Sequence, residues 1–288
     1  MPELPEVETV VRGLQATLPG KRIVDVRLGK TDFIEDPSAL ERELPGRRVL
    51  NVRRYGKFIV LSFDASAGSD YSGLLIHLGM TGQIVVCPTN APVRPHTHVF
   101  MGLDDGREFR YTDIRRFGSM QLLPDGPNGG GFETLGTDPL EATEREFRTQ
   151  ISGRRARIKA LLLDQRALRG MGNIYTDESL WRARIHPTRI AADLSDKELR
   201  KLYQAVQWIL NGAIRLRGSS VSDYVDSEGQ RGEFQLRHRV YQRKGKKCFR
   251  CGTAIERMIV AGRSSYFCPR CQRAPRGRAR KKKTGTRR

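Results

Sequence analysis

The chain has 288 residues, of which 38% are hydrophobic, and it carries a formal net charge of +20. This length suggests about two domains with proper cores, and the excess of positive charge points to a polyanionic partner, most simply nucleic acid. No apolar run approaches the roughly 18 residues of a membrane span, and the glutamate-rich N-terminus is unlike a signal peptide, so we expect a cytoplasmic protein.

The first residues read MPELPE, which places a proline directly behind the initiator methionine. Aminopeptidases remove that methionine when the next residue is small, and removal would expose the secondary amine of Pro2. An α-amino group has a pKa of roughly 8, against about 10.4 for lysine, so more of it is free base at neutral pH. Beside the carboxylate of Glu3, such an amine can attack a sugar or aldehyde carbon and form an iminium. The alternative is that Pro2 and Pro5 only stiffen the start of a helix.

Residues 5–17 are predicted to form that helix, because apolar residues recur at helical spacing from Val7 to Leu14 and Pro5 suits a first turn. From there to about residue 123 the pattern is one of short strands separated by turns. The expected strands cover residues 22–28, 48–53, 58–63, 74–78, 83–87, 98–103, 108–112 and 119–123. Eight short strands at this spacing indicate a sandwich or a barrel.

A Pro/Gly-rich stretch marks residues 124–134 as a linker. Beyond it, helices are expected over residues 139–150, 155–164, 173–183 and 195–216, and Ser195 with Glu198 is a capping-box signature for the last one. We therefore expect a β domain at 1–123, a helical domain at 135–235 and a metal module at 236–273. The basic tail at 274–288 is expected to be disordered and to add affinity for nucleic acid that does not depend on sequence.

The metal module carries two Cys-x-x-Cys pairs, formed by Cys248 with Cys251 and by Cys268 with Cys271. Sixteen residues separate the pairs, which matches the spacing of a tetrahedral Cys₄ zinc site. Disulfides are the alternative, but a reducing cytosol disfavours them. The spacing therefore predicts one structural Zn²⁺, while Cys87, inside a strand pattern, is expected to be a buried apolar residue.

Taken together, the motifs closely resemble those of the bacterial formamidopyrimidine-DNA glycosylase family, whose members remove oxidised purines from DNA. The matching segments are MPELPEVE at the start, GKFIV around Lys57, HLGMTG at 77–82, RYTDIRRFG at 110–118, GMGNIYTDESL at 170–180 and CGTAIERMIVAGRSSYFCPRCQ at 251–272. The resemblance implies an α+β multidomain fold: a β-sandwich with an N-terminal helix, a helix-two-turn-helix domain and a zinc-finger hairpin. It also implies a monomer that holds damaged double-stranded DNA in the cleft between the domains and needs no cofactor besides zinc.

The same resemblance assigns catalytic roles. Pro2 would attack the sugar C1′ and expel the damaged base, and Glu3 would protonate the opening sugar ring. Lys57 matches a proton donor in β-elimination, and Arg263 matches the finger arginine that contacts phosphate and takes part in δ-elimination. A general acid must hold its proton, and either burial or the second carboxylate of Glu6 could raise the pKa of Glu3. Simple helix capping is the alternative role for Glu6.

The resemblance also implies a set of DNA contacts. Arg155 stands where relatives commonly have lysine, and Asn173 opens a helix whose backbone amides can receive phosphate. Residues 218–234 match the segment that closes over the flipped base. Three residues match those that fill the gap left when a nucleotide leaves the stack. The complete expected set is His96, Arg155 and Asn173 together with the gap-filling Met80, Arg115 and Phe117.

Two other interpretations remain open at this point. The endonuclease VIII group shares the scaffold but prefers oxidised pyrimidines; Leu4, where those relatives commonly carry glycine, favours the purine branch. A zinc-ribbon protein that binds nucleic acid without catalysis would fit the charge and the cysteines equally well. Retention of Met1 in the purified protein would favour that second interpretation, because it would block the Pro2 amine.

Overall fold

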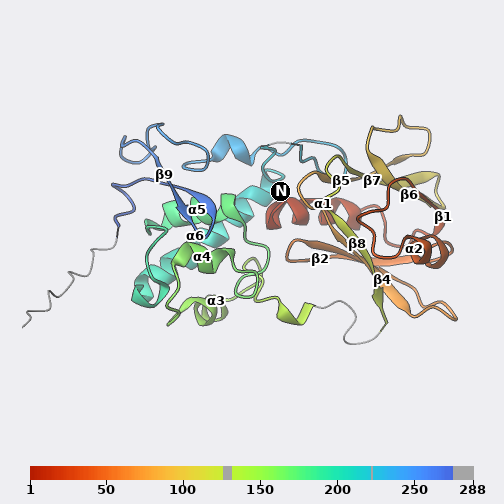
Figure 1. Cartoon of the computed structure of the whole chain (residues 1–288), viewed down its shortest axis with the longest axis horizontal. Coiled ribbons are helices and arrows are strands. Elements are labelled where there is room, and N and C mark those ends of the chain that lie inside the picture. The colour runs from red at the N-terminus through yellow and green to blue at the C-terminus, as the bar shows by residue number, and fades with distance from the viewer. Residues whose placement is uncertain (126–131, 222, 275–288) are drawn as a thin grey trace, which may run out of the picture.

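The computed structural model describes residues 1–125, 132–221 and 223–274, so most of the expected linker and all but the first residue of the basic tail lie outside it. The molecule is elongated, with strands gathered at one end, helices at the other and the N-terminus between them (Figure 1). Within the described residues, no helix is long and apolar enough to cross a membrane.

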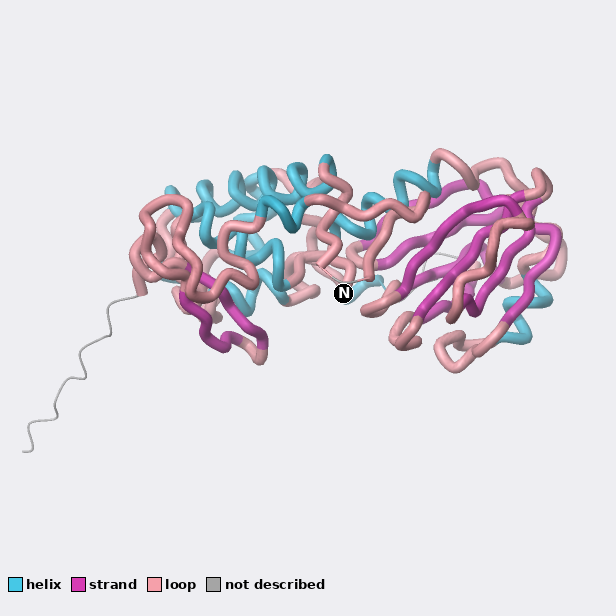
Figure 2. Tube along the Cα trace, turned by 90° about the horizontal axis from the view of Figure 1, so that it is seen from above, coloured by secondary structure: helices cyan, strands magenta, loops and turns pink. Residues whose placement is uncertain are grey.

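All eight expected strands are confirmed, and they form two four-stranded antiparallel sheets. The first sheet has the order β1-β6-β7-β5 and the second the order β2-β3-β4-β8. Their buried faces share one apolar core, so the arrangement is a sandwich and not a barrel (Figure 2). The strands are β1 (Ile23–Leu28), β2 (Val49–Tyr55), β3 (Phe58–Phe63), β4 (Tyr71–His77), β5 (Gly82–Pro88), β6 (Thr97–Leu103), β7 (Arg107–Asp113) and β8 (Ser119–Pro124).

The N-terminal helix α1 (Leu4–Gln15) joins the two halves of the molecule. Its apolar stripe from Val7 to Leu14 is buried in the sandwich core, whereas Leu4 is buried in the core of the helical domain. A second helix, α2 (Pro37–Glu43), was not expected; Asp36 caps it by accepting a hydrogen bond from the Ala39 amide (2.9 Å).

Four further helices confirm the expected helical domain: α3 (Glu144–Ile151), α4 (Ile158–Leu163), α5 (Asn173–Ala183) and α6 (Asp196–Arg215). The Ser195 capping box of α6 is confirmed, with the Ser195 amide donating to Glu198 Oε2 (2.9 Å) and the Glu198 amide donating to Ser195 Oγ (3.3 Å). Helix α3 begins at Glu144 and not at 139, because Thr143 and Glu146 form a capping box that the sequence reading overlooked.

The zinc-finger region contains a β-hairpin of β9 (Glu256–Val260) and β10 (Arg263–Phe267). Both turn residues have positive φ, +50° for Ala261 and +70° for Gly262, as a two-residue type I′ turn requires. The hairpin projects from the helical end of the molecule (Figure 2). The fully buried Lys159 anchors it, donating from Nζ to the Ser264 carbonyl (2.8 Å) and to Asp177 Oδ1 (2.7 Å) on α5.

Candidate active site

A pocket of about 640 Å³ opens where α1, the β2–β3 turn, the start of α5 and the finger hairpin meet. Glu3, Lys57 and Arg263 all line it, so the fold brings together three residues from distant parts of the sequence that were expected to be catalytic. Met1 also lines the pocket, and Pro2 is buried behind it. In a chain that keeps Met1, the Pro2 nitrogen is an amide without a free lone pair; removal of Met1 would give it a reactive amine and clear space in the pocket.

Several contacts between the two domains fix the position of the chain start. The Leu4 amide donates to the Gly170 carbonyl (3.0 Å). The buried guanidinium of Arg54 on β2 pairs both with Glu8 on α1 (2.7 Å) and with Asp138 of the helical domain (2.6 Å). Because one cation serves carboxylates from both sides, α1 cannot move far relative to either domain.

The Glu3 carboxyl group lies at the N-terminus of α5, with only 4% of the residue exposed. Oε1 accepts a hydrogen bond from the Ile174 amide (3.0 Å) and Oε2 from the Tyr175 amide (3.4 Å). Burial raises the pKa of Glu3, while the charge of Lys57 and these two amides act in the opposite direction. Burial prevails, so Glu3 can hold the proton that a general acid must give away.

The same contacts involve two of the amides that were expected to receive phosphate beside Asn173. The backbone amides that follow it in α5 donate to Glu3, so the structure does not leave them free for phosphate. The Asn173 side chain donates instead to the Ser264 carbonyl of the finger hairpin (2.9 Å) and lines the pocket. Asn173 therefore ties the hairpin to the edge of the active site.

Glu6 follows Glu3 by three positions in the chain and is also buried. Its Oε2 accepts from the Glu3 amide (2.8 Å), and its Oε1 accepts from the Ser219 amide (2.7 Å) and from the Tyr175 hydroxyl. Burial, followed by the charge of Glu3, raises the pKa of Glu6 to about 7. For the pKa of Glu3, burial is the largest cause, which decides between the two explanations left open by the sequence.

Lys57 lies in the turn between β2 and β3, one residue before β3 begins. Burial lowers its pKa; the carboxyl groups of Glu3 and Glu6 oppose this shift, and the nearby charge of Arg263 adds to it. A lysine amine with a lowered pKa exchanges protons more readily near neutral pH than an ordinary one. Arg263 itself is exposed at the first position of β10, beside the tight turn.

Met80, Arg115 and Phe117 lie on two adjacent loops at one end of the sandwich. The loops touch closely: a Cβ on Gly79 would lie 2.3 Å from the Phe117 carbonyl. Met80 is 39% exposed and Phe117 56% exposed, and the Arg115 guanidinium stacks 4.4 Å over the Phe117 ring. Met80 and Phe117 are thus exposed apolar residues and not part of the core, as side chains that fill the gap left by an extruded nucleotide have to be.

One buried residue that sequence reasoning missed organises these loops. Asp113, which is fully buried at the end of β7, accepts hydrogen bonds from the Gly118 amide (2.9 Å), the Arg115 amide (3.2 Å) and the Thr81 hydroxyl. One carboxylate therefore holds both loops in register. The signal for Asp113 in the sequence was its place inside the matching segment RYTDIRRFG.

The other two expected DNA contacts are exposed. His96 lies in the β5–β6 loop with φ of +65°, and its carbonyl accepts from the Asp113 amide (3.0 Å). Arg155 is exposed just before α4. Neither side chain lines the 640 Å³ pocket, so any contact they make with a ligand lies outside it.

The described part of the 218–234 segment packs against the N-terminal domain. A Cβ on Gly13 of α1 would overlap the Ser227 hydroxyl at 1.8 Å, and the Tyr224 hydroxyl donates to the Glu6 carbonyl (3.3 Å). Val221, which is 40% exposed, lines the active-site pocket. The segment thus reaches from α6 across α1 to the pocket.

Two adjacent acids of α5, Asp177 and Glu178, were also missed as positioning residues. Asp177 Oδ2 accepts from the Tyr266 amide of the hairpin (2.9 Å). Glu178 accepts from the Arg239 and Tyr241 amides (2.9 Å each), and burial raises its pKa to about 7. The residues around these two acids in α5 are buried as well, and buried carboxyl groups need partners inside the protein.

The four cysteines form the expected cluster, with all sulfur atoms within 4.8 Å of one another. The Arg250 amide donates to Cys248 Sγ and the Cys271 amide to Cys268 Sγ, both at 3.4 Å, so in each Cys-x-x-Cys pair the first sulfur accepts a backbone hydrogen bond from within the turn. Sulfur ligands at about 2.3 Å from a tetrahedral Zn²⁺ are separated by less than 4 Å, and Cys251 and Cys268 are 3.4 Å apart. The donor set fits one zinc ion, which would hold the base of the hairpin that carries Arg263.

Comparison with known proteins agrees with this geometry. Residues 1–120 match the formamidopyrimidine-DNA glycosylase N-terminal domain, residues 135–225 the formamidopyrimidine-DNA glycosylase H2TH domain, and residues 245–274 the zinc finger found in FPG and IleRS. A formamidopyrimidine-DNA glycosylase from Desulforamulus reducens is 43% identical over 281 residues, which cover 95% of this chain and 100% of that protein.

Solved structures give the same result. The Lactococcus lactis Fpg in complex with DNA containing an abasic site is 33% identical, with a TM-score of 0.84, and the match covers 94% of this chain and 100% of that one. A structure of MutM in complex with DNA containing carbocyclic 8-oxo-G has the same identity and TM-score, and the match covers 95% of this chain and 100% of the other.

Proposed function

This chain belongs to the formamidopyrimidine-DNA glycosylase family, and from that premise we propose that its Pro2 nitrogen is the nucleophile that removes oxidised purines from DNA. The protein is a DNA glycosylase of base excision repair whose substrate is damaged DNA. One structural Zn²⁺ supports its finger hairpin. We place its work on chromosomal DNA in the cytoplasm, as a monomer, with the residue roles and domain limits that the sequence predicted.

The observation that carries the proposal is the junction pocket, where the chain start, Lys57 and Arg263 meet beside a buried Glu3 whose pKa is raised by burial. With Met1 removed, the Pro2 lone pair attacks the sugar C1′, and the bond from C1′ to the damaged base breaks. The base leaves with the bonding pair and takes up the proton that the amine loses.

Ring opening completes the first stage. Glu3 gives its proton to the ring oxygen O4′ as the C1′–O4′ bond breaks, and the nitrogen lone pair forms the iminium. The positive charge of the iminium is then matched by the negative charge of the Glu3 carboxylate. The Ile174 and Tyr175 amides stabilise this carboxylate, since they already point at its oxygen atoms (3.0 and 3.4 Å).

Strand cleavage uses the other two pocket residues. Loss of a C2′ proton to water expels the 3′ phosphate in β-elimination, and loss of a C4′ proton to water expels the 5′ phosphate in a second elimination. Lys57, with its lowered pKa, is the proton donor in the first elimination. Arg263 contacts phosphate with its two-pronged guanidinium and serves the second elimination. Outside the pocket, Met80, Arg115 and Phe117 fill the gap left by the extruded nucleotide.

Reductive trapping tests this function directly. Borohydride added to the chain without Met1 and a duplex containing 8-oxoguanine should reduce the iminium to a stable protein–DNA adduct, and peptide mass spectrometry should map that adduct to Pro2. A matched chain that retains Met1 should give no adduct. An adduct on an internal lysine, or equal trapping of both chains, would contradict the role of Pro2. Stronger trapping by a thymine-glycol duplex would place the enzyme with the endonuclease VIII group.

A further inference from the structure

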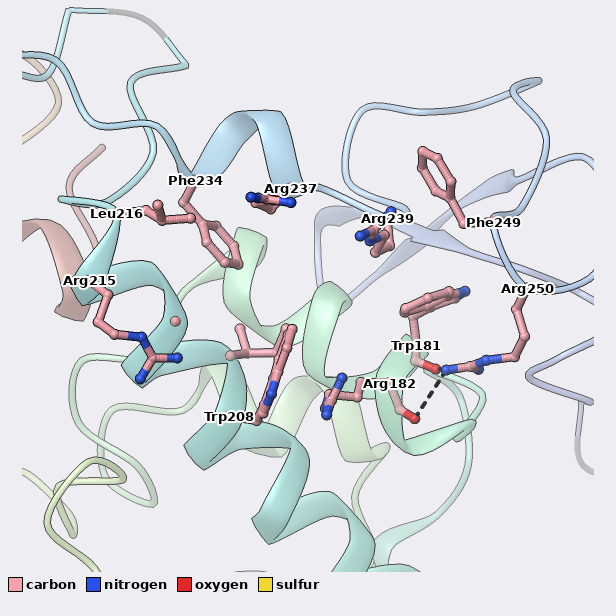
Figure 3. Close-up of a pocket in the computed structure, with 12 residues that line it drawn as sticks. Trp181, Arg182, Trp208, Arg215, Leu216, Phe234, Arg237, Arg239, Phe249 and Arg250 are labelled. Carbon is pink, nitrogen blue, oxygen red and sulfur yellow. Dashed lines mark hydrogen bonds between the residues drawn. The ribbon is translucent and has the colours of Figure 1, made fainter.

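A second pocket, of about 950 Å³, lies between the C-terminal end of α5, the second half of α6 and the first cysteine turn of the finger (Figure 3). We propose that this arginine pocket docks an acidic peptide segment of a partner protein, anchored by one apolar side chain. It would allow the repair enzyme to be recruited by another protein while its active site holds DNA.

Positive charge dominates the lining. Five arginines contribute to it, and within the described residues none of them is in an ion pair with a carboxylate: Arg182, Arg215, Arg237, Arg239 and Arg250. Partial burial and the neighbouring charge of Arg250 lower the pKa of Arg182. Like charges gathered without a counter-ion favour an anionic partner.

The bottom of the pocket is apolar. Ile209 and Phe234 are each 3% exposed and form its floor, while Trp208 and Phe249 are 50% and 60% exposed at its rim. In Figure 3, Arg237 and Arg239 face Trp208 and Arg182 across this space. A pocket with an apolar floor and charged rim accepts an apolar side chain whose flanking residues carry the opposite charge.

The arginine pocket is separate from the active site. The two pockets share no lining residue. Helix α5 contributes Asn173 and Ile174 at its start to the active site, and Trp181 and Arg182 at its end to the arginine pocket. Trp181 lies eight positions after Asn173 in the helix, which corresponds to about 12 Å along the axis.

The lining also argues against other occupants. The chain beyond residue 274 contains eight Lys/Arg and no acid, so it is repelled by the pocket. Single-stranded nucleic acid binds through free aromatic faces, but here guanidinium groups stack on the rings: Arg182 lies 3.6 Å from the Trp208 centroid and Arg239 4.5 Å from that of Phe249. An acidic peptide with an apolar anchor uses both the charge and the floor.

The protein contains only two tryptophans, and both Trp181 and Trp208 line this pocket, so its intrinsic fluorescence reports occupancy without a label. The probe is a synthetic peptide with one central phenylalanine flanked by aspartates and without Trp or Tyr, titrated into the full-length zinc-containing protein. We expect a saturable change in tryptophan emission that weakens as salt is added. A peptide with alanine in place of the phenylalanine should bind about tenfold more weakly or worse.

The variants test the site itself. The double variant Arg215→Glu/Arg237→Glu should weaken binding of the aspartate peptide by about tenfold or more. Arg53→Glu, an exposed charge reversal on β2 in the other domain, is the matched control and should leave it unchanged. Both variants should still be trapped on lesion DNA, which shows that they fold.

Three outcomes would overturn the proposal. The first is no saturable fluorescence change with the aspartate peptide. The second is equal binding of a lysine-flanked peptide. The third is tighter binding of a short single-stranded oligonucleotide that is lost in the double variant, which would make the pocket a nucleic-acid site.

Discussion

Alanine at position 172 would place a methyl group on top of the Glu3 carboxyl group. The new Cβ would lie 2.2 Å from Cδ and 2.5 Å from Oε1 of Glu3. Gly172 has φ of −134° and ψ of −167°, an extended conformation that alanine adopts without strain. The clash therefore acts on Glu3 and not on the backbone at residue 172, so Gly172→Ala tests the placement of the general acid.

The expected cost follows from the contacts that are lost. Glu3 must leave the Ile174 amide, at 3.0 Å, and the weaker contact with the Tyr175 amide, at 3.4 Å. A hydrogen bond between neutral groups contributes about 0.5–1.5 kcal/mol, and a buried carboxyl group left without partners adds about 1–3 kcal/mol to the loss. We expect the free energy of unfolding to fall by about 2–4 kcal/mol. Base excision should slow by about 100-fold or more, because a displacement of about 1 Å is enough for that.

Single-turnover excision of 8-oxoguanine and urea denaturation measure the two effects. Glu3→Gln separates position from acidity: its amide oxygen can still accept from α5, so it should fold nearly normally, yet excision should fall about 10²- to 10⁴-fold for lack of a proton donor. The matched control is Gly212→Ala on α6, where the new Cβ meets nothing closer than 3.9 Å. It should stabilise the helix by about 0.5–1 kcal/mol and leave excision unchanged.

Base excision by Gly172→Ala within about threefold of the parent rate would show that the position of Glu3 does not control the proton transfer. Equal stability of that variant and the parent would contradict the expected clash with Glu3, because a carboxyl group forced from its partners must carry a cost. A Glu3→Gln variant with full activity would show that another group supplies the proton.

Three other predictions concern the supports of the site. Lys159→Met should lower the free energy of unfolding, measured by urea denaturation, by about 3–5 kcal/mol, because it leaves Asp177 buried without its cation. The double variant Lys159→Met/Asp177→Asn should recover part of that loss. A Lys159→Met variant as stable as the parent would be evidence that Lys159 does not anchor the hairpin. Cys251→Ser, or removal of zinc by a chelator, should loosen the hairpin and weaken binding to lesion DNA at least about tenfold in gel-shift measurements. Cys87→Ser on β5 is the control and should leave binding unchanged. Burial raises the pKa of Glu6 to about 7, above its ordinary 4.5, so the folded state favours the protonated form and loses stability as pH rises between those values. The stability of the parent relative to Glu6→Gln should therefore fall by about 2–3 kcal/mol between about pH 5 and pH 8. A pH-independent difference would contradict the raised pKa.

Elements whose signal is local could be predicted from sequence. All eight strands and the helix α5 lie within a few residues of the expected ranges, because alternation and helical period depend only on neighbours in the chain. The cysteine cluster was equally accessible, since the spacing of two Cys-x-x-Cys pairs fixes which four sulfur atoms can meet. The elements that differ from the expectation also have local causes, because caps at Asp36 and Thr143 set the start of α2 and of α3.

Most site residues were named through a family resemblance, and the contacts that set their pKa values were not visible in the sequence. Glu3 and the Ile174 amide are 171 positions apart, and no pattern in the chain says that the start of α1 caps α5. The same holds for Asp113 across two loops and for Lys159 beneath the hairpin. Sequence alone determined the elements, the metal ligands and the proline behind Met1. Only the tertiary structure decided which carboxyl groups have a raised pKa, because that depends on burial and on charges brought close by packing of the two domains.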